Sequence, residues 1–422
     1  MSSTEKIIVL GDWLFDENDR KKRDGFGKEI VYGILVCLLF TVSFSLSESD
    51  VIAETGYSPV VQKLLTLYKA DPEILDKALA NAITPPTGKC SVSPVTDKPF
   101  CWNGKSINDL LDFFENWLGF TPTPQDDGFG NYQLFYDLCY NNNYALKFVE
   151  TEPWLNWTRD FTKARGKKMD GPVKPEIIQE WKDFLGPHWD DYIIPEGGFT
   201  SFNQFFTRDI KPEKRPVYGD DTILVAPADS LVNAINSNLT ATTKISTKYY
   251  ENLNIRELLD GSKYADTFNG GTAISCILLP TVYHHYHSPV GGTVIESRSV
   301  DGTSFGMNGE FYTFINNGNI GGYKSRFGIF GIYHRGYYII KTEKYGLVGM
   351  ISVGLDDVNS VNFDPGFQDI PKKYPIKVVK KGQRLGHFAY GGSMVILLFE
   401  PDVFKGLKMH QGQQIGILNE TQ

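Results

Sequence analysis

YGGSMVILLF, the sequence of residues 390–399, joins two glycines and a serine to an uninterrupted apolar run. Gly391 and Gly392 can take backbone conformations that residues with a Cβ resist. The run Val395–Phe399 is typical of a buried β-strand. We therefore expect Ser393 at a rigid junction between a loop and a strand. This geometry favours attack of the Ser393 hydroxyl on the preceding carbonyl, although glycine and serine are also common in ordinary β-turns.

The composition is that of a globular protein with more than one domain. A chain of 422 residues is long enough for two or three domains, and its hydrophobic content of 41% and charged content of 22% are ordinary. The formal net charge of -8 argues against a nucleic-acid-binding protein, which usually has a basic surface. All seven tryptophans precede residue 190, which predicts different cores for the two halves of the chain.

Residues 1–50 contain a predicted N-terminal leader. The basic residues Lys21-Lys22-Arg23 precede Ile30–Leu46, which carries no charge over 17 residues. This length is short for a membrane span and slightly long for the apolar part of a signal peptide. The basic flank favours a cytoplasmic N-terminus, so we expect a membrane-associated or lumenal, secretory protein. Signal peptide and anchor both remain open, and a buried helix of a soluble protein is the alternative.

Residues 51–195 predict a helical accessory domain. Ser106 is typical of a helix N-cap, and apolar residues follow it at helical spacing from Ile107 to Leu118. Similar apolar spacing occurs in Ser58–Ile83 and in Ile177–Leu185. Such stripes usually form the core face of a helix. No catalytic pattern stands out in this domain.

Cys90 and Cys101 are separated by a step rich in Ser, Pro, Thr and Asp. In an oxidising compartment this spacing permits a disulfide, and two buried free thiols are the alternative. No CxxC pair is present, so the sequence does not predict a zinc knuckle.

Residues 196–422 predict a β-rich catalytic domain. Short apolar segments such as Thr293–Val300, Tyr337–Thr342 and Leu347–Val353 are separated by Gly, Asn and Asp. This pattern predicts a sandwich or a barrel-like core. Together with the helical region it predicts an α+β fold.

Two stretches of this domain hold further groups that are suited to nucleophilic catalysis. The stretch VAPADS holds Asp229, and LPTVYHHYHSPVGG holds His284, His285 and His287. A carboxylate can orient an imidazole, which then removes the proton of a hydroxyl. Asp229, His287 and Ser393 could form such a set. A metal site at His285 and His287 is the alternative, but no spacing selects a third ligand.

FFTRDIKPEKRP, at residues 205–216, combines aromatic residues with cations. Taken alone, such a cluster of cations is most often a solvated loop.

These stretches, in this order, resemble the phosphatidylserine decarboxylase family over most of residues 199–400. The shared patterns are FFTRxIKPxxRP, APAD, YHxxHSPVxG, the weaker GLVGMISVGLDDV, and Gly-Gly-Ser followed by a strand. The helical region is similar in layout to the accessory segment of a subgroup that includes fungal tryptophan decarboxylases.

The resemblance implies a proenzyme that cuts itself between Gly392 and Ser393. His287, oriented by Asp229, would deprotonate the Ser393 hydroxyl. The products would be a β chain that ends at Gly392 and an α chain that begins with a pyruvoyl group derived from Ser393. This covalent cofactor would serve as the electron sink for decarboxylation, with no metal required. His284 would bind the substrate or return a proton. Arg208, Lys211 and Arg215 would lie where an anionic phosphate or carboxylate could be held, with a structural role as the alternative.

Four positions depart from the family pattern. Met394 replaces a threonine or serine, Ser230 a glycine, His285 an arginine and Gly291 an aspartate. The loss of a hydroxyl at Met394 could slow processing, but the proposed Asp–His–Ser set is intact, which favours an active enzyme.

The resemblance implies phosphatidylserine as the substrate, converted at a membrane to phosphatidylethanolamine and CO₂. Decarboxylation of a free amino acid, such as tryptophan, is one alternative. A non-catalytic binding protein that has lost self-processing is another.

Overall fold

The computed structural model describes residues 56–82, 90–92, 98–126, 128–139, 142–240, 255–305, 333–355, 360–409 and 411–412. The predicted leader segment Ile30–Leu46 lies outside these ranges. No helix within them is both long and apolar enough to cross a bilayer. The chain divides into two compact units, Met1–Pro59 and Val60–Gln422, so the helical and β-rich regions share the second unit.

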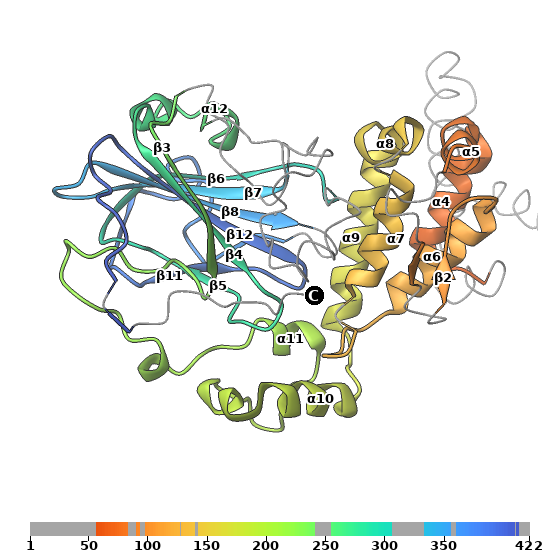
Figure 1. Ribbon diagram of the computed structural model, residues 1–422, viewed down its shortest axis with the longest axis horizontal. Helices are drawn as coiled ribbons and strands as arrows, with labels where there is room; N and C mark the ends of the chain where they lie inside the picture. The colour runs from red at the N-terminus through yellow and green to blue at the C-terminus, as the bar shows by residue number, and fades with distance from the viewer. Residues whose placement is uncertain are drawn as a thin grey trace, which may run out of the picture. The chain divides into compact units, whose positions relative to one another are not determined.

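The accessory region is helical, as predicted (Figure 1). Its α-helices are α4 (Pro59–Ala70), α5 (Glu73–Ala80), α6 (Ile107–Gly119), α7 (Phe129–Cys139), α8 (Asn143–Glu150), α9 (Trp154–Asp170) and α10 (Pro175–Leu185). The 3₁₀ helix η2 (Gly186–Asp191) continues from α10, and the short strands β1 (Ser91–Val92) and β2 (Pro99–Phe100) pair antiparallel.

Helix α6 begins at the predicted cap. The Ser106 side chain accepts from the backbone N–H of Asp109, and the Asp109 carboxylate accepts from the backbone N–H of Ser106. The apolar stripe then buries Phe114, whose ring centroid lies 4.7 Å from that of Trp157 and 5.0 Å from that of Phe161 in α9. The aromatic residues of the accessory region therefore form its core.

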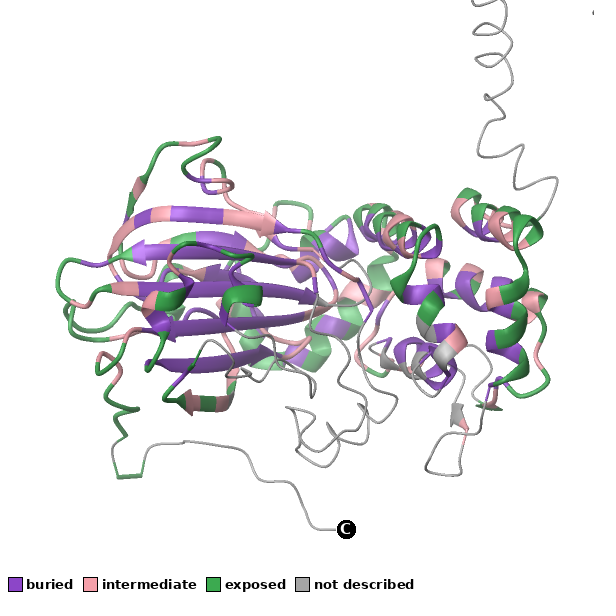
Figure 2. Ribbon diagram, turned by 90° about the horizontal axis from the view of Figure 1, so that it is seen from above, coloured by how far each residue is buried: buried purple, intermediate pink, exposed green. Residues whose placement is uncertain are grey.

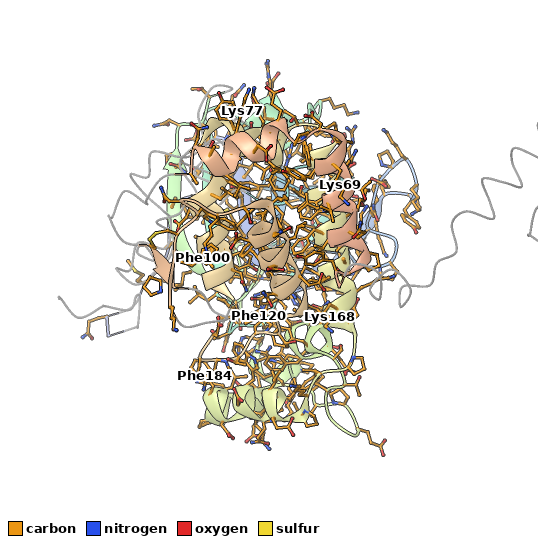
Figure 3. The ribbon with its side chains drawn as sticks, turned by 90° about the vertical axis from the view of Figure 1, so that its right-hand side faces the viewer. Lys69, Lys77, Phe100, Phe120, Lys168 and Phe184 are labelled. Carbon is orange, nitrogen blue, oxygen red and sulfur yellow. A yellow bond between two sulfur atoms is a disulfide. The ribbon has the colours of Figure 1, made fainter. Side chains whose placement is uncertain are left out.

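Several of these helices have a lysine in their last turn. Lys69, Lys77 and Lys168 lie in the last turns of α4, α5 and α9 (Figure 3). A cation at this end of a helix is favourable, because the helix dipole places partial negative charge there.

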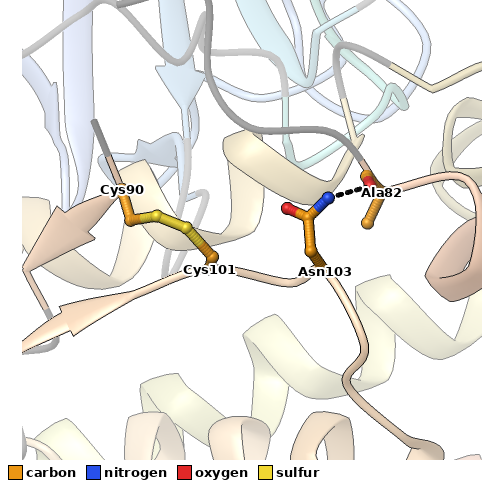
Figure 4. Close-up of a disulfide and its surroundings, with 4 residues drawn as sticks. All are labelled: Ala82, Cys90, Cys101 and Asn103. Atoms are coloured by element: carbon orange, nitrogen blue, oxygen red, sulfur yellow. Dashed lines mark hydrogen bonds between the residues drawn. A yellow bond between two sulfur atoms is a disulfide. The ribbon is translucent and has the colours of Figure 1, made fainter. Parts of the chain in front are cut away.

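Cys90 and Cys101 form a disulfide in the structure, with their Cα atoms 5.1 Å apart (Figure 4). Beside it, the Asn103 amide donates a 2.9 Å hydrogen bond to the Ala82 carbonyl (Figure 4). The disulfide alternative is therefore the one that the structure adopts for this pair. Cys139 and Cys276 are buried free thiols.

Residues 196–422 contain a seven-stranded antiparallel sheet with the strand order β10-β6-β7-β8-β12-β4-β3. Its strands are β3 (Leu231–Ser237), β4 (Thr272–Leu278), β6 (Gly292–Val300), β7 (Arg335–Lys341), β8 (Leu347–Leu355), β10 (Lys377–Val379) and β12 (Gly392–Phe399). Strands β6, β7 and β8 confirm the three segments predicted from the sequence, and β12 confirms the strand after the glycines.

A second sheet, with the order β5-β11-β9, packs on one face of the first. It comprises β5 (His285–His287), β9 (Asn362–Phe363) and β11 (Arg384–His387). Val395 and Leu397 of β12 share a core with Tyr286 of β5 and Leu385 of β11, and Figure 2 shows the central strands as buried. Because β10 and β3 are open edges of the large sheet, the described chain forms a sandwich rather than the barrel-like alternative.

The opposite face of the large sheet is covered by α12 (Ile255–Leu258) and η4 (Ala265–Phe268). Gly349 of β8 leaves room for this cover, since a Cβ there would lie 3.3 Å from the Phe268 ring. Arg335 of β7 donates to the Leu258 carbonyl at 2.9 Å. Both faces of the sheet are therefore buried, which explains why the β12 sequence is apolar without alternation.

Helix α11 (Phe202–Phe206) and the 3₁₀ helix η3 (Pro212–Lys214) follow the accessory helices in the chain. The aromatic residues of α11 join a second core with residues from α9, α10 and η2. Tyr283 and Tyr390, which precede the histidine stretch and the Gly-Gly-Ser, also belong to this core. The core thus connects the accessory region to the predicted site.

Candidate active site

Ser393 is the second residue of β12, in register with Gly354 of β8 and Leu278 of β4. Its side chain is 0% exposed, and its hydroxyl has no hydrogen-bond partner among the described residues. Gly391 has a φ of 146°, which residues with a Cβ rarely adopt. The structure therefore places Ser393 at the predicted junction of a loop and a strand, and it shows in addition that the hydroxyl is buried without a partner among the described residues.

Met394 points away from this hydroxyl. Successive side chains of a strand lie on opposite faces, so Ser393 shares the face of Val395, whereas Met394 lies on the other face. Met394 is fully buried there and pairs with Ile277 and Val353. The hydroxyl that the family usually has at position 394 would therefore not lie on the face of the strand that Ser393 occupies.

The rings of His284 and His287 are each fixed through Nδ1 by a backbone carbonyl. Nδ1 of His284 lies 2.8 Å from the Val282 carbonyl, and Nδ1 of His287 lies 2.8 Å from the Gly382 carbonyl. A carbonyl only accepts, so these nitrogens carry the proton and each Nε2 is the basic nitrogen. Nε2 of His287 lies 3.2 Å from the Tyr283 hydroxyl. Burial lowers the pKa of His287, which keeps the ring neutral, as a general base must be.

The predicted hydrogen bond between Asp229 and His287 is not present. Instead, Arg215 donates two hydrogen bonds to the Asp229 carboxylate, from Nε to Oδ1 at 2.8 Å and from Nη2 to Oδ2 at 2.6 Å. The planar guanidinium matches a carboxylate better than a single imidazole N–H does. The Gly382 carbonyl takes the orienting role at His287. Among the described residues, no hydrogen bond joins Asp229, His287 and Ser393.

Each of the three cations predicted to bind an anion has a partner within the chain. Arg208 is 2% exposed and donates to the carbonyls of Phe205 at 3.1 Å and Thr281 at 3.0 Å. Its guanidinium also lies 4.0 Å from the centre of the Tyr192 ring. Lys211 donates to the Asp190 carbonyl at 2.6 Å, and Arg215 holds Asp229. These contacts favour the structural alternative, while substrate binding by these cations stays a prediction.

His284 is fully buried next to α11. The centre of its ring lies 3.9 Å from that of Phe206, and the Phe206 ring lies 5.3 Å from that of Tyr390. Tyr390 is three residues before Ser393, so α11 brings His284 and the Gly-Gly-Ser turn to one place. Sequence reasoning identified His284 but missed Phe206 and Tyr390 as its neighbours.

His285 packs on the outer face of the small sheet. Its Nε2 donates to the Thr207 carbonyl at 2.8 Å, and its ring lies 5.3 Å from that of His387. Within the described ranges, no three His, Cys, Asp or Glu residues gather in a way that could hold a metal ion. The metal alternative at His285 and His287 therefore has no third ligand in this part of the chain.

Because the His285 ring is buried, we expect the folded protein to lose stability in acid. Burial lowers its pKa from the ordinary 6.5 to about 4. Between these values the unfolded chain binds a proton that the folded chain does not, so the free energy of unfolding falls as the pH falls. At pH 5 we expect a loss of roughly 2 kcal/mol from this residue. Urea unfolding at pH 7 and pH 5 measures it. His285→Gln, which keeps a donor for Thr207, should lose correspondingly less, and an equal loss would contradict the assignment.

Known proteins match the region that contains this site. A model of the phosphatidylserine decarboxylase family matches residues 202–417, about half of the chain. Phosphatidylserine decarboxylase proenzyme 3 of Schizosaccharomyces pombe is 33% identical over 252 residues, which cover 58% of this chain and 23% of that protein. The phosphatidylserine decarboxylase proenzymes of Clostridium perfringens and Fusobacterium nucleatum are each 29% identical, covering 76% and 81% of those proteins and 58% and 61% of this chain.

The family match contains every residue of the candidate site, from Arg208 to Ser393. The chain therefore belongs to the phosphatidylserine decarboxylase family, a family of carboxy-lyases. It spans about a quarter of the length of the yeast relative and at least three quarters of the two bacterial ones. The match begins at Phe202, so the likeness of the helical region to a particular subgroup stays a prediction.

Proposed function

We propose that this chain is a pyruvoyl-dependent phosphatidylserine decarboxylase that cuts itself between Gly392 and Ser393. The observation that carries this proposal is the Ser393 hydroxyl, which is fully buried and has no hydrogen-bond partner among the described residues. A buried polar group without a partner is costly, and such groups often have a chemical role. Here the hydroxyl follows the two glycines at which the family divides its proenzyme.

The proposed cleavage uses only the chain and water. A neutral histidine, His287 in this proposal, removes the Ser393 proton, and Oγ attacks the carbonyl carbon of Gly392. The peptide bond is exchanged for an ester, and elimination then releases Gly392 as a free carboxylate. One water hydrolyses the dehydrated residue 393 and releases ammonia, which leaves the pyruvoyl group. Asp229 contributes through Arg215 and the local field rather than through a hydrogen bond to His287.

The pyruvoyl group would supply a carbonyl that withdraws electrons as CO₂ leaves an amine-bearing carboxylate. The residues that would hold it are those that now surround Ser393, with Leu278 and Gly354 beside it in the sheet. His284 is held through its Nδ1, and its basic Nε2 is suited to returning a proton to the product.

Release of CO₂ from carboxyl-labelled substrates tests this proposal. The purified full chain would be given phosphatidylserine in mixed micelles, free serine or free tryptophan. We expect release from phosphatidylserine alone, as the names of the relatives suggest. Release from tryptophan would favour the free amino acid instead. A cleaved chain that releases no CO₂ from any of the three would contradict the proposed decarboxylase activity.

We also propose that the protein is lumenal or membrane-associated. The uncharged segment Ile30–Leu46 behind a basic cluster supports this, as does the Cys90–Cys101 disulfide, since disulfides persist in oxidising compartments. We expect the chain to resist protease in intact microsomes and to be digested once detergent is added. Digestion without detergent would contradict a lumenal location.

A further inference from the structure

The backbone just before the cleavage site is held by helix α11. The N–H of Tyr390 donates to Oδ1 of Asn203 at 3.2 Å, and both residues are buried. The Tyr390 ring also packs edge-on against Phe202, with ring centres 5.4 Å apart. Only Gly391 and Gly392 lie between this anchor and Ser393.

Asn203 extends the anchor to helix α9. Its Nδ2 donates to Oδ1 of Asp170, the last residue of α9, at 2.8 Å. The two contacts fix the orientation of the amide, because a backbone N–H needs an acceptor and a carboxylate needs a donor. A continuous hydrogen-bonded link therefore runs from the C-terminus of α9 through Asn203 to Tyr390.

The accessory region itself contacts the other end of Tyr390. Gly128, in the loop before α7, has a φ of +82°. A Cβ built at Gly128 would lie 2.7 Å from the Tyr390 hydroxyl oxygen and 3.0 Å from the Phe120 ring. The loop therefore closes on the ring of Tyr390 with no space for a side chain.

We propose that the accessory region is part of the self-cleavage machinery and acts through Asn203 of α11, a positioning residue that it holds in place. Attack by the Ser393 hydroxyl requires the Gly392 carbonyl carbon at near-attack distance, and Gly392 is only the first residue of β12, preceded by a second glycine, Gly391. Strand β12 fixes Ser393 on one side, and Asn203 fixes Tyr390 on the other. This inference rests on the proposed self-cleavage and assigns a role to residues that touch neither reacting atom.

Exchanging the side chains of Asn203 and Asp170 tests the hydrogen-bonded link between α9 and Tyr390. Asn203→Asp keeps an acceptor for Tyr390 but sets a second carboxylate against Asp170. Asp170→Asn alone keeps an acceptor for the Asn203 amide. The double variant restores one donor and one acceptor with their places reversed. The readout is the rate at which newly translated chain is cut, followed by intact mass. We expect Asn203→Asp to be at least tenfold slower, since small misplacements are costly in such reactions. Asp170→Asn and the double variant should be within threefold of the wild type.

Two further variants separate positioning from general destabilisation. Ser297→Ala removes a buried hydrogen bond that the backbone N–H of Ile370 donates to the Ser297 hydroxyl. Ser297 lies in β6, the third strand from β12 in the large sheet. This substitution should lower the melting temperature without slowing cleavage. Gly128→Ala should slow cleavage by displacing Tyr390. Melting temperatures of all variants would be measured in a Ser393→Ala background, in which no chain is expected to be cut.

The outcomes are distinct. If Asn203→Asp is cut at the wild-type rate, or if the folded double variant is as slow as Asn203→Asp, the positioning role is wrong and self-cleavage stands. If cleavage rates simply follow melting temperature, Ser297→Ala included, the link is only structural and the inference is overturned. If the folded wild-type chain is never cut, the proposed function fails and this inference fails with it.

Discussion

Replacing Ser393 with alanine is expected to abolish both self-cleavage and decarboxylation. The wild-type chain should yield a large chain that ends at Gly392 and a small one that covers residues 393–422. The variant should stay as one uncut chain, because alanine lacks the hydroxyl that would attack the Gly392 carbonyl. Intact mass under denaturing conditions measures this, and it also identifies a pyruvoyl group at the start of the small chain.

Ser352→Ala is the matched control for this experiment. Ser352 is a fully buried serine on β8, opposite Val395, and it lies on the same face of the sheet as Ser393. Its loss removes a hydroxyl of similar burial one strand away and leaves the glycine turn unchanged, so the chain should still be cut. A folded wild-type chain that stays uncut would contradict the enzyme proposal and favour a binding protein that has lost self-processing.

The strands and helix starts could be predicted because their causes are local. An apolar run such as Val395–Phe399 forms a strand wherever it can be buried, and Ser106 caps α6 through its own neighbour Asp109. The Gly-Gly-Ser junction is equally local. These features depend on residues within a few positions of one another, so the sequence alone was sufficient.

The partners of the site residues could not be predicted in the same way. Asp229 is held by Arg215, which competes for the carboxylate from a separate loop, and the orienting group of His287 is the Gly382 carbonyl. Every residue has a carbonyl, so no sequence pattern marks the one that the fold brings into place. Arg208 looked like an anion-binding cation, and only the tertiary structure shows that it is buried over Tyr192.

One polar residue of α11, Asn203, could have been identified from the sequence as a residue with a positioning role. Asn203 lies among Phe202, Phe205 and Phe206, where a polar side chain would be buried without a partner if α11 were only a core helix. A buried amide of this kind usually has its hydrogen bonds satisfied. Asn203 has these partners in Asp170 and Tyr390, and so it links the accessory helices to the β-rich region within one compact unit.

The second large effect is expected from alanine substitution of His287 and of His284. The first variant should lose self-cleavage, and the second should lose decarboxylation. In the proposal, His287 is the base for self-cleavage, so His287→Ala should slow cleavage by about 10²- to 10⁴-fold, the usual contribution of a general base. His284→Ala should still be cut but should decarboxylate poorly, because its role comes after the pyruvoyl group has formed. His188→Ala is the control, since this histidine is exposed in η2 and should change neither rate.

One result would reverse the roles proposed for His287 and His284. Alternation along β5 places His287 on the face opposite Tyr286, and Tyr286 is the residue that shares the core with Val395. His284, in contrast, is connected to Tyr390 through the Phe206 ring. If His284→Ala blocks cleavage and His287→Ala does not, His284 is the base. The Gly382 and Tyr283 contacts of His287 would then serve to hold the loop, and the order of the motif would have misled the assignment.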